Sequence, residues 1–250
     1  MKKLKHLIKT ARLIIMAYLL GEAFLICTFL FPFLSSKTQK KYVRKWSERV
    51  ISTFDISVKI VNPWNLRNLD GCLIVANHIS WIDVQVIHSI FYCKFISTTE
   101  VLSLPVIGRL AKAAGSLFID LAKPKRSTYL ISQDMVNSLI KKEAICAFPE
   151  ATSTDGKGVL AFKSSLFQAA INASAPICPI ALRYLDQNGQ PSERLGFYGE
   201  MTLLESMIAT ACSGPNVAEL TILPLMSANK DKHQLAADCH LLIEGVVKNS

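Results

Sequence analysis

The sequence predicts an α/β protein whose central sheet is flanked by helices and preceded by a helical segment embedded in a membrane. From about Ile56 onward, short apolar runs alternate with helix-like segments, which is the pattern of an α/β domain. Before that, Leu13–Leu34 is an almost unbroken apolar stretch. We therefore divide the 250 residues into a membrane-embedded and interfacial segment, 1–54, and an α/β domain, 55–250.

The apolar stretch is long enough to cross a membrane. As a helix it would extend about 33 Å, against a bilayer core of roughly 30 Å. Glu22 opposes a full crossing, because an ionisable residue near mid-bilayer costs on the order of 3 kcal/mol. Basic residues flank both ends, so the positive-inside rule favours neither orientation. A full span and a re-entrant segment bent near Pro32 both remain open.

The next stretch, Lys37–Phe54, has the pattern of an amphipathic helix. Its apolar residues recur at helical spacing with basic residues between them; they are Tyr42, Val43, Trp46, Val50 and Ile51. We expect this helix to lie at the membrane interface on anionic lipid. The alternative is an amphipathic helix packed on the domain.

The domain is predicted to contain eight strands and six helices. Strands are expected at Val58–Val61, Cys72–Ala76, Lys94–Thr98, Ser116–Asp120, Ile145–Phe148, Ile177–Tyr184, Gly196–Tyr198 and Leu220–Leu225. Helices are expected at Trp81–Phe91, Pro105–Ala114, Ser127–Lys141, Lys163–Ala173, Leu203–Met207 and Lys230–Lys248.

Charge and cysteine usage exclude several classes of protein. The net charge of +9 suits anionic partners, but the basic residues cluster beside the apolar stretch and no nucleic-acid-binding motif is present. We therefore expect no nucleic acid partner. The seven cysteines are odd in number and have no Cys-x-x-Cys pair, which indicates reduced cysteines and neither a disulfide framework nor a zinc site.

A histidine and an aspartate follow the predicted strand Cys72–Ala76. Ligands of α/β proteins usually bind at the carboxyl ends of strands. His78 and Asp83 are five residues apart, so a turn can bring the carboxylate to the imidazole and leave the other ring nitrogen free to accept a proton. The alternative is an Asp helix cap beside an ordinary loop histidine.

A second polar segment follows the strand at Ile145. It runs Phe148-Pro149-Glu150-Ala151-Thr152-Ser153, and Pro149 rigidifies the exit from the strand. Glu150 therefore also emerges at a strand end, where its polar neighbours could line a site.

These segments resemble the motifs of the lysophosphatidic acid acyltransferase family, part of the glycerolipid acyltransferase superfamily. Asn77, His78 and Asp83 match its Asn-His-x-x-x-x-Asp motif, and Phe148, Pro149, Glu150 and Thr152 match Phe-Pro-Glu-Gly-Thr-Arg-Ser. Gly115, Phe118, Ile119 and Asp120 correspond to its second motif, and residues 175–180 to its fourth. Four motifs in order form a specific resemblance. It implies a mixed central sheet.

The resemblance also implies a reaction and a site. His78 is the general base, oriented by Asp83, and removes a proton from a lysolipid hydroxyl that attacks an acyl thioester without a covalent intermediate. The co-substrate is acyl-CoA or acyl carrier protein, with no cofactor and no metal. The implied location is the cytoplasmic side of a bacterial inner membrane. Expected substrate-binding residues are Asn77, Ser80, Gly115, Asp120, Phe148, Pro149, Glu150, Ala151, Thr152, Ser153 and Lys163.

The chain departs from the family where a headgroup would bind. The third motif's Gly and Arg are Ala151 and Ser153, and the second motif's Arg is Leu121. Arginine binds two phosphate oxygens at once, so these changes weaken the case for a phosphate headgroup. The basic residues that could substitute are Arg109, Lys123, Lys125, Arg126 and Lys163.

Three functions follow from these observations. The first is acylation of 1-acyl-sn-glycerol-3-phosphate to phosphatidic acid. The second is acylation of lyso-ornithine lipid, because residues 152–156 and 162–167 also resemble that bacterial branch. The third, of another class, is a catalytically idle membrane module that binds lipid. The presence of both His78 and Asp83 argues against the third. The sequence leaves the oligomeric state open.

Overall fold

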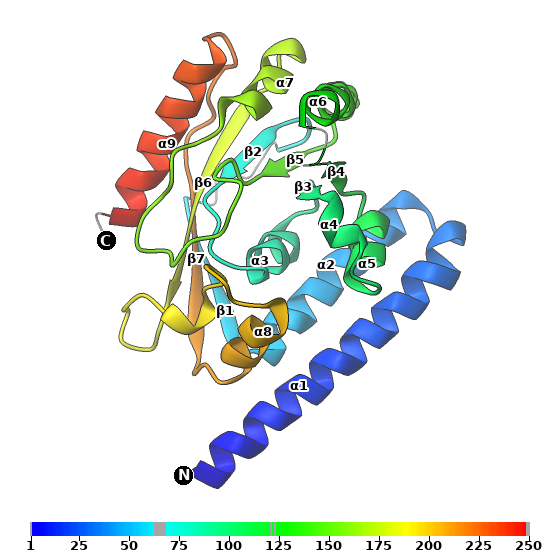
Figure 1. Ribbon diagram of the computed structural model, residues 1–250, viewed down its shortest axis with the longest axis vertical. Helices are drawn as coiled ribbons and strands as arrows, with labels where there is room; N and C mark the ends of the chain where they lie inside the picture. The colour runs from blue at the N-terminus through cyan, green and yellow to red at the C-terminus, as the bar shows by residue number, and fades with distance from the viewer. Residues whose placement is uncertain (1, 63–68, 121, 123, 249–250) are drawn as a thin grey trace.

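The computed structural model describes residues 2–62, 69–120, 122 and 124–248, and a seven-stranded mixed sheet lies at its centre (Figure 1). The strands are β1 (Ile56–Val61), β2 (Leu73–Ala76), β3 (Lys94–Thr98), β4 (Leu117–Ile119), β5 (Ile145–Ala147), β6 (Ile177–Leu185) and β7 (Asn216–Ile222). Their order is β1-β7-β6-β2-β5-β3-β4, and all neighbours are parallel except β6 and β7. The predicted fold class is confirmed.

Helices cover both faces of the sheet (Figure 1). One core contains buried residues of α6 (Pro124–Ile140), α7 (Phe167–Asn172) and α9 (Lys232–Lys248). The other contains residues of α1 (Lys2–Leu25), α2 (Ser36–Thr53), α3 (Ile82–Ile90) and α8 (Leu203–Ala211). Strand β2 serves both, because successive side chains of a strand point to opposite faces: Leu73 and Val75 join the first core, Ile74 and Ala76 the second. All four are buried, as the apolar run predicts.

The structure differs from the predicted elements in two places. Gly196–Tyr198 is not a strand: the Phe197 N–H donates to the Ile79 carbonyl at 2.9 Å, so this segment pairs with the loop after β2 and not with the sheet. A short helix, α4 (Thr99–Leu102), precedes α5 (Ile107–Ala113) and was not predicted. The other predicted elements are present with shifted ends.

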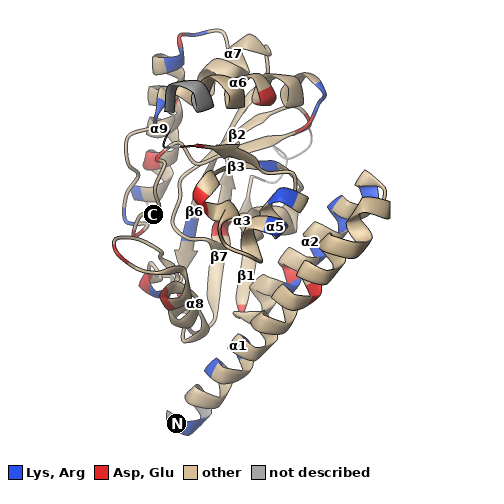
Figure 2. Cartoon of the chain, turned by 45° about the vertical axis from the view of Figure 1, so that its right-hand side comes forward, with Lys and Arg blue, Asp and Glu red and all other residues tan. Residues whose placement is uncertain are grey.

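The amino-terminal apolar stretch forms one arm of a helical hairpin. Helix α1 continues through η1 (Ile26–Leu30) into the short turn η2 (Phe31–Phe33), and α2 then returns beside α1 (Figures 1 and 2). This confirms a bend near Pro32. The stretch His6–Phe33 is long and apolar enough to cross a membrane by length and composition, and 17% of its most apolar window is buried. Several of its large side chains are exposed, among them Ile14, Tyr18, Phe29 and Phe33.

An ion pair explains the acidic residue within the apolar stretch. Arg49 Nη1 of α2 donates to Glu22 Oε1 of α1 at 2.8 Å. Arg49 Nη2 also lies 2.7 Å from Glu22 Oε2, so the two side chains form an ion pair. The carboxylate therefore meets a cation supplied by the other arm of the hairpin.

The apolar face of α2 packs on the protein. Val43, Trp46, Val50 and Ile51 are buried, and the Trp46 indole N–H donates to the Leu19 carbonyl of α1 at 3.0 Å. These side chains therefore pack on the domain, as the alternative expected, and the placement of this helix at a membrane interface stays a prediction that its other side would have to meet. The exposed side of α2 is basic (Figure 2), with Lys37, Lys40, Lys41, Arg44 and Lys45.

We expect Trp46→Ala to destabilise the protein by about 3–5 kcal/mol, because it removes a buried aromatic side chain and its hydrogen bond. Urea unfolding in detergent micelles, followed by circular dichroism, measures this change. Tyr18→Ala, which removes an exposed aromatic side chain of α1, is the control and should cost less than about 0.5 kcal/mol. Equal small losses in both variants would contradict the packing of α2.

Candidate active site

His78 and Asp83 meet at the carboxyl end of β2. His78 is the second residue after the strand, and Asp83 lies in the first turn of α3. The His78 Nδ1 and Asp83 Oδ2 atoms are 2.7 Å apart, as the sequence predicted. Asp83 is fully buried, whereas 22% of the His78 side chain is exposed. Because the carboxylate accepts the Nδ1 proton, the lone pair of the ring is on Nε2.

The Asp83 carboxylate has four donors in all. Oδ2 also accepts the backbone N–H groups of Ile79 and Ser80 at 2.7 and 2.9 Å. Oδ1 accepts the Tyr184 hydroxyl at 2.6 Å. Burial, together with the negative charge of Asp83, raises the pKa of Tyr184 well above its ordinary value, so the phenol remains a neutral donor. This set of donors fixes the carboxylate and stabilises its charge.

Tyr184 was missed by the sequence analysis. It lies on β6, and its position in an apolar strand predicted only that it would be buried. A polar tip within a buried strand indicates that a partner exists, because a buried hydroxyl needs one. The identity of that partner required the pairing of β6 beside β2.

Glu150 holds the His78 loop from the other side. Its Oε1 accepts the His78 backbone N–H and its Oε2 accepts the Leu160 N–H, both at 2.7 Å, and the residue is buried. Burial raises the pKa of Glu150, while the two backbone hydrogen bonds oppose that rise. Both oxygens are thus engaged within the protein, and direct contact of Glu150 with a substrate stays a prediction.

Two other predicted binding residues are fully buried. The Asn77 amide donates to the Leu182 carbonyl and accepts the Leu182 N–H, at 2.9 and 2.8 Å. Ser80 gives its backbone N–H to Asp83. These contacts attach the His78 loop to β6 and α3, so both residues position the site and are not open to a substrate.

The segment after Glu150 closes against the same loop. The Thr154 N–H donates to the His78 carbonyl at 2.9 Å, and the Ser153 hydroxyl donates to the Phe197 carbonyl. The Lys163 N–H donates to the Pro149 carbonyl at 2.9 Å. The side chains of Ala151, Thr152 and Lys163 are exposed. Ala151 has a φ of 60°, a left-handed conformation that favours the glycine expected from the family motif.

The second predicted motif is not part of the cavity beside His78. Gly115 has a φ of +75° in the turn before β4, and an added Cβ would lie 3.0 Å from the Tyr92 hydroxyl oxygen. Asp120 ends β4 and accepts the Ala122 N–H at 2.9 Å. Leu121 and Lys123 lie outside the described residues, as do the side chains of Lys125 and Arg126. Arg109 contacts α1, donating to Thr28 Oγ1 at 3.1 Å and lying over the Phe24 ring.

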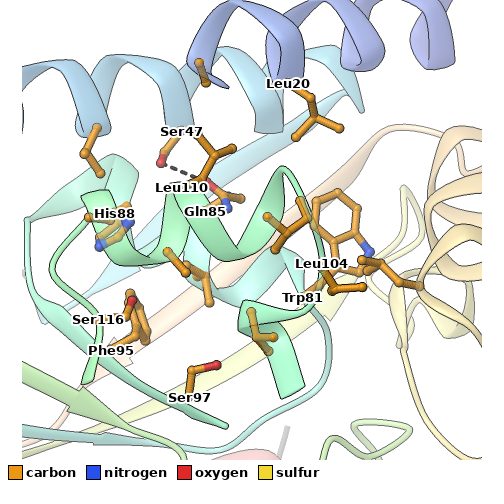
Figure 3. Close-up of a pocket in the computed structure, with 18 of the residues that line it drawn as sticks. Leu20, Ser47, Trp81, Gln85, His88, Phe95, Ser97, Leu104, Leu110 and Ser116 are labelled. Carbon is orange, nitrogen blue, oxygen red and sulfur yellow. Dashed lines mark hydrogen bonds between the residues drawn. The ribbon is translucent and has the colours of Figure 1, made fainter. Parts of the chain in front are cut away.

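An apolar cavity of about 610 Å³ has His78 in its lining. Figure 3 shows other residues that line it, among them Trp81 and Phe95. Its walls come from α1, α2, α3, β3, α4, α5 and α8. Phe148 stacks on the His78 ring, with centroids 4.1 Å apart and planes at 12°, and also lines the cavity. The imidazole therefore sits between a buried carboxylate and an apolar chamber.

No group of three or more His, Cys, Asp or Glu side chains that could hold a metal ion occurs among the residues that the structure describes. Independence from metals and cofactors stays a prediction.

Comparison with known proteins decides the family. Residues 57–183, just over half of the chain, match the family described as Acyltransferase. The chain belongs to this acyltransferase family. The fold agrees with the crystal structure of the 1-acyl-sn-glycerophosphate acyltransferase PlsC from Thermotoga maritima, at a TM-score of 0.75 and 16% identity, covering 100% of this chain and 97% of that one.

Two groups of acyltransferase relatives are similar in sequence. Identity is 32% over 158 residues to the 1-acyl-sn-glycerol-3-phosphate acyltransferase of Neisseria meningitidis serogroup B, covering 63% of this chain and 61% of the relative. It is 27% over 199 residues to the lyso-ornithine lipid O-acyltransferase of Pseudomonas aeruginosa, covering 79% and 75%. The alignment thus spans about three fifths of the length of the first relative and three quarters of the second.

We expect Tyr184→Phe to lower the rate of any reaction at His78 by about tenfold or more. The variant removes one neutral donor to a buried carboxylate, a hydrogen bond worth about 1.5–3 kcal/mol. Initial rates of acyl transfer measure the change, and circular dichroism checks that the fold is retained. Tyr198→Phe, at an exposed tyrosine, is the matched control. Equal activity of the two variants would show that Asp83 does not depend on Tyr184.

His88 of α3 is buried, and its Nε2 lies 2.9 Å from the Cys93 carbonyl. Burial lowers the pKa of His88 from 6.5 to about 4. The unfolded chain therefore binds this proton at a higher pH than the folded chain. Stability from this group is complete above pH 6.5 and is lost as the pH falls toward 4, by up to about 3 kcal/mol.

Urea unfolding of the wild type and His88→Phe between these pH values measures this contribution, because the other titrating groups are common to both proteins. The stability of the wild type should fall more steeply with decreasing pH than that of the variant. Parallel curves would contradict the lowered pKa.

Proposed function

We propose that this protein transfers a fatty acyl group from an acyl thioester to the free hydroxyl of a lysolipid. The observation that carries the proposal is the His78–Asp83 pair, with Nδ1 bound to the carboxylate and the ring lining an apolar cavity. Within the described residues, Nε2 makes no hydrogen bond. It is therefore free to accept a proton from a substrate hydroxyl.

The proposed reaction has two steps. His78 Nε2 takes the acceptor hydroxyl proton as the oxygen attacks the thioester carbonyl, and the buried Asp83 carboxylate stabilises the imidazolium that forms. The C–S bond then breaks, and the leaving thiolate takes the proton from His78. The thioester is acyl-CoA or acyl-ACP, and no group of the protein becomes covalently attached to the acyl chain.

The cavity supports the lipid part of the proposal. Its lining is largely apolar, with side chains such as Leu20, Trp81, Leu104 and Leu110 (Figure 3). His78 is also part of the lining. An acyl chain buried there gains about 0.8 kcal/mol for each CH₂ group removed from water. The thioester carbon can then lie at His78 while the chain occupies the chamber.

We propose 1-acyl-sn-glycerol-3-phosphate as the acceptor, with lyso-ornithine lipid as the second candidate. The relatives named above support both. Ser153 favours the second, because it stands where the family motif has an arginine and its hydroxyl is bound to the Phe197 carbonyl. Arg109 is engaged with α1, so among the described candidates the exposed Lys163 is left to meet a phosphate.

The hairpin of α1 and α2 is the proposed site of membrane association. Helix α1 presents exposed apolar side chains, and α2 returns beside it with exposed lysines. A full crossing by α1 would draw those charges toward the hydrocarbon, where each costs about 2.5–3.5 kcal/mol at the centre. The arrangement therefore supports a hairpin that enters one leaflet, at a bacterial inner membrane with the domain on the cytoplasmic side.

We expect His78→Ala to lower acyl transfer by about 10²–10⁴-fold, which is the usual contribution of a positioned general base. Asp83→Asn should also be impaired, because the ring loses its charged partner. The assay uses purified full-length protein in detergent with a radiolabelled acyl thioester, and lysophosphatidic acid and lyso-ornithine lipid as parallel acceptors. Near-normal turnover by His78→Ala would exclude the mechanism.

The same assay separates the classes of function. Transfer by the wild type to one acceptor identifies the headgroup. Wild-type protein that transfers to neither acceptor, nor to a wider panel of lysolipids, would favour the idle lipid-binding module. Lys163→Ala should weaken the use of lysophosphatidic acid through a higher KM, while an unchanged KM would remove Lys163 from headgroup binding.

A further inference from the structure

The acyl cavity has hydrogen-bonding groups in one wall. Helix α3 and its N-cap residue present Trp81, Val84, Gln85 and His88 to the chamber. The Trp81 indole N–H has no partner among the described residues. Gln85 and His88 are polar and three residues apart, so they are neighbours on one side of the helix (Figure 3). An apolar pocket with a few placed polar groups recognises a ligand that carries matching polar atoms.

The orientation of Gln85 is set by α2, which forms another wall of the chamber. The hydroxyl of Ser47, a fully buried residue of α2, donates to Gln85 Oε1 at 2.9 Å (Figure 3). The side-chain carbonyl oxygen of Gln85 is therefore already hydrogen-bonded to a residue of α2. The Nε2 group, with two donor hydrogens, makes no hydrogen bond within the described part of the chain. Gln85 therefore has donor capacity to spare at the cavity.

His88 supplies the complementary group. Its Nε2 donates to the Cys93 carbonyl, and its lowered pKa keeps the ring neutral at physiological pH. In that tautomer Nδ1 carries a lone pair and is an acceptor. No donor to Nδ1 is present among the residues described here. Gln85 Nε2 thus offers a donor and His88 Nδ1 an acceptor, about one helical turn apart. This pair fits a hydroxyl, because a hydroxyl both donates and accepts.

We propose that Gln85 and His88 select an acyl chain that carries a hydroxyl group along its length. The hydroxyl oxygen accepts a hydrogen bond from Gln85 Nε2 and the hydroxyl hydrogen is donated to His88 Nδ1. This inference rests on the proposed acyl transfer, since it concerns the same cavity. The chain can belong to the thioester donor or to the lysolipid acceptor, and both have the same chemistry.

The position of the pair limits where the hydroxyl lies. His88 follows Asp83 by five residues, which is about 7.5 Å along the helix axis. Asp83 holds the His78 ring, where the reacting carbon must lie. The hydroxyl therefore belongs in the half of the chain nearer the carboxyl carbon, and a hydroxyl close to the methyl end should not be recognised.

A competition assay tests the proposal. Full-length protein in detergent receives equal amounts of a plain and a hydroxylated acyl thioester of the same length, and mass spectrometry gives the ratio of the two products. In a second arm the donor is plain and the two chains are carried by the lysolipid. We expect the hydroxylated chain to be preferred by at least about fivefold in one arm, which corresponds to about 0.5 kcal/mol from each of two hydrogen bonds, the lower end of their usual range. The arm that shows the preference identifies the source of the chain.

Gln85→Leu should lower that ratio to near one, because leucine fills similar space without a donor. Gln168→Leu, the same exchange on α7 outside the cavity, should leave the ratio unchanged. His88→Phe is a second variant and should also lower the ratio. The ratio is measured within one reaction mixture, so a partial loss of folded protein does not alter it.

The outcomes are separable from those of the proposed function. Transfer of the plain chain by the wild type supports acyl transfer whatever the ratio. A wild-type ratio near one in both arms overturns the inference and leaves the proposed function standing. A preference that survives Gln85→Leu and His88→Phe also overturns it, because some other part of the cavity must then recognise the hydroxyl.

Discussion

The architecture of the site depends on one buried negative charge. Asp83 takes up hydrogen bonds from His78, Tyr184 and two backbone N–H groups, so all of its neighbours are fixed by their contact with it. A charge removed from water is tolerated when it is paired and hydrogen-bonded. The donors come from the β2 loop and from β6, so the site exists only when those two strands lie side by side.

The fold brings the site together because β2 pairs in parallel with both β5 and β6. Two carboxylates, of Asp83 and Glu150, then hold His78. Strands β2 and β5 pair, which places the loops after both at one edge of the sheet. Glu150 from the β5 loop then accepts the backbone N–H of His78 and thereby anchors the residue that Asp83 holds by its ring. Glu150 thus fixes the backbone of His78, and Asp83 fixes its ring through Nδ1. The ring nitrogen Nε2 is left available for a substrate.

Much of this was predictable from local sequence. Three short-range patterns predicted the site: the buried strand before Asn77, the spacing of His78 and Asp83, and the polar segment at Glu150. The structure brings His78, Asp83 and Glu150 together. Tyr184 and the Phe197 segment lie far away in the chain, so only the strand order shows that they meet the His78 loop. The sequence could not show what the apolar face of α2 contacts, because a face that meets lipid and a face that meets a protein core have the same kinds of residues. Gly115 was expected to bind substrate from its motif match, but it lies between two cavity-lining residues, Ala114 and Ser116, and does not line the cavity itself.

The hairpin gives the protein a property that neither of its arms has alone. Helices α1 and α2 supply part of the chamber wall, through residues such as Leu20 and Trp46, while the outer side of α1 remains apolar. With the hairpin in a leaflet as proposed, an aliphatic tail dissolved in the bilayer and one held in the cavity would lie on opposite sides of the hairpin. A tail would then load by lateral partition from the bilayer with no aqueous transit, and the lipid composition would govern which tails reach His78.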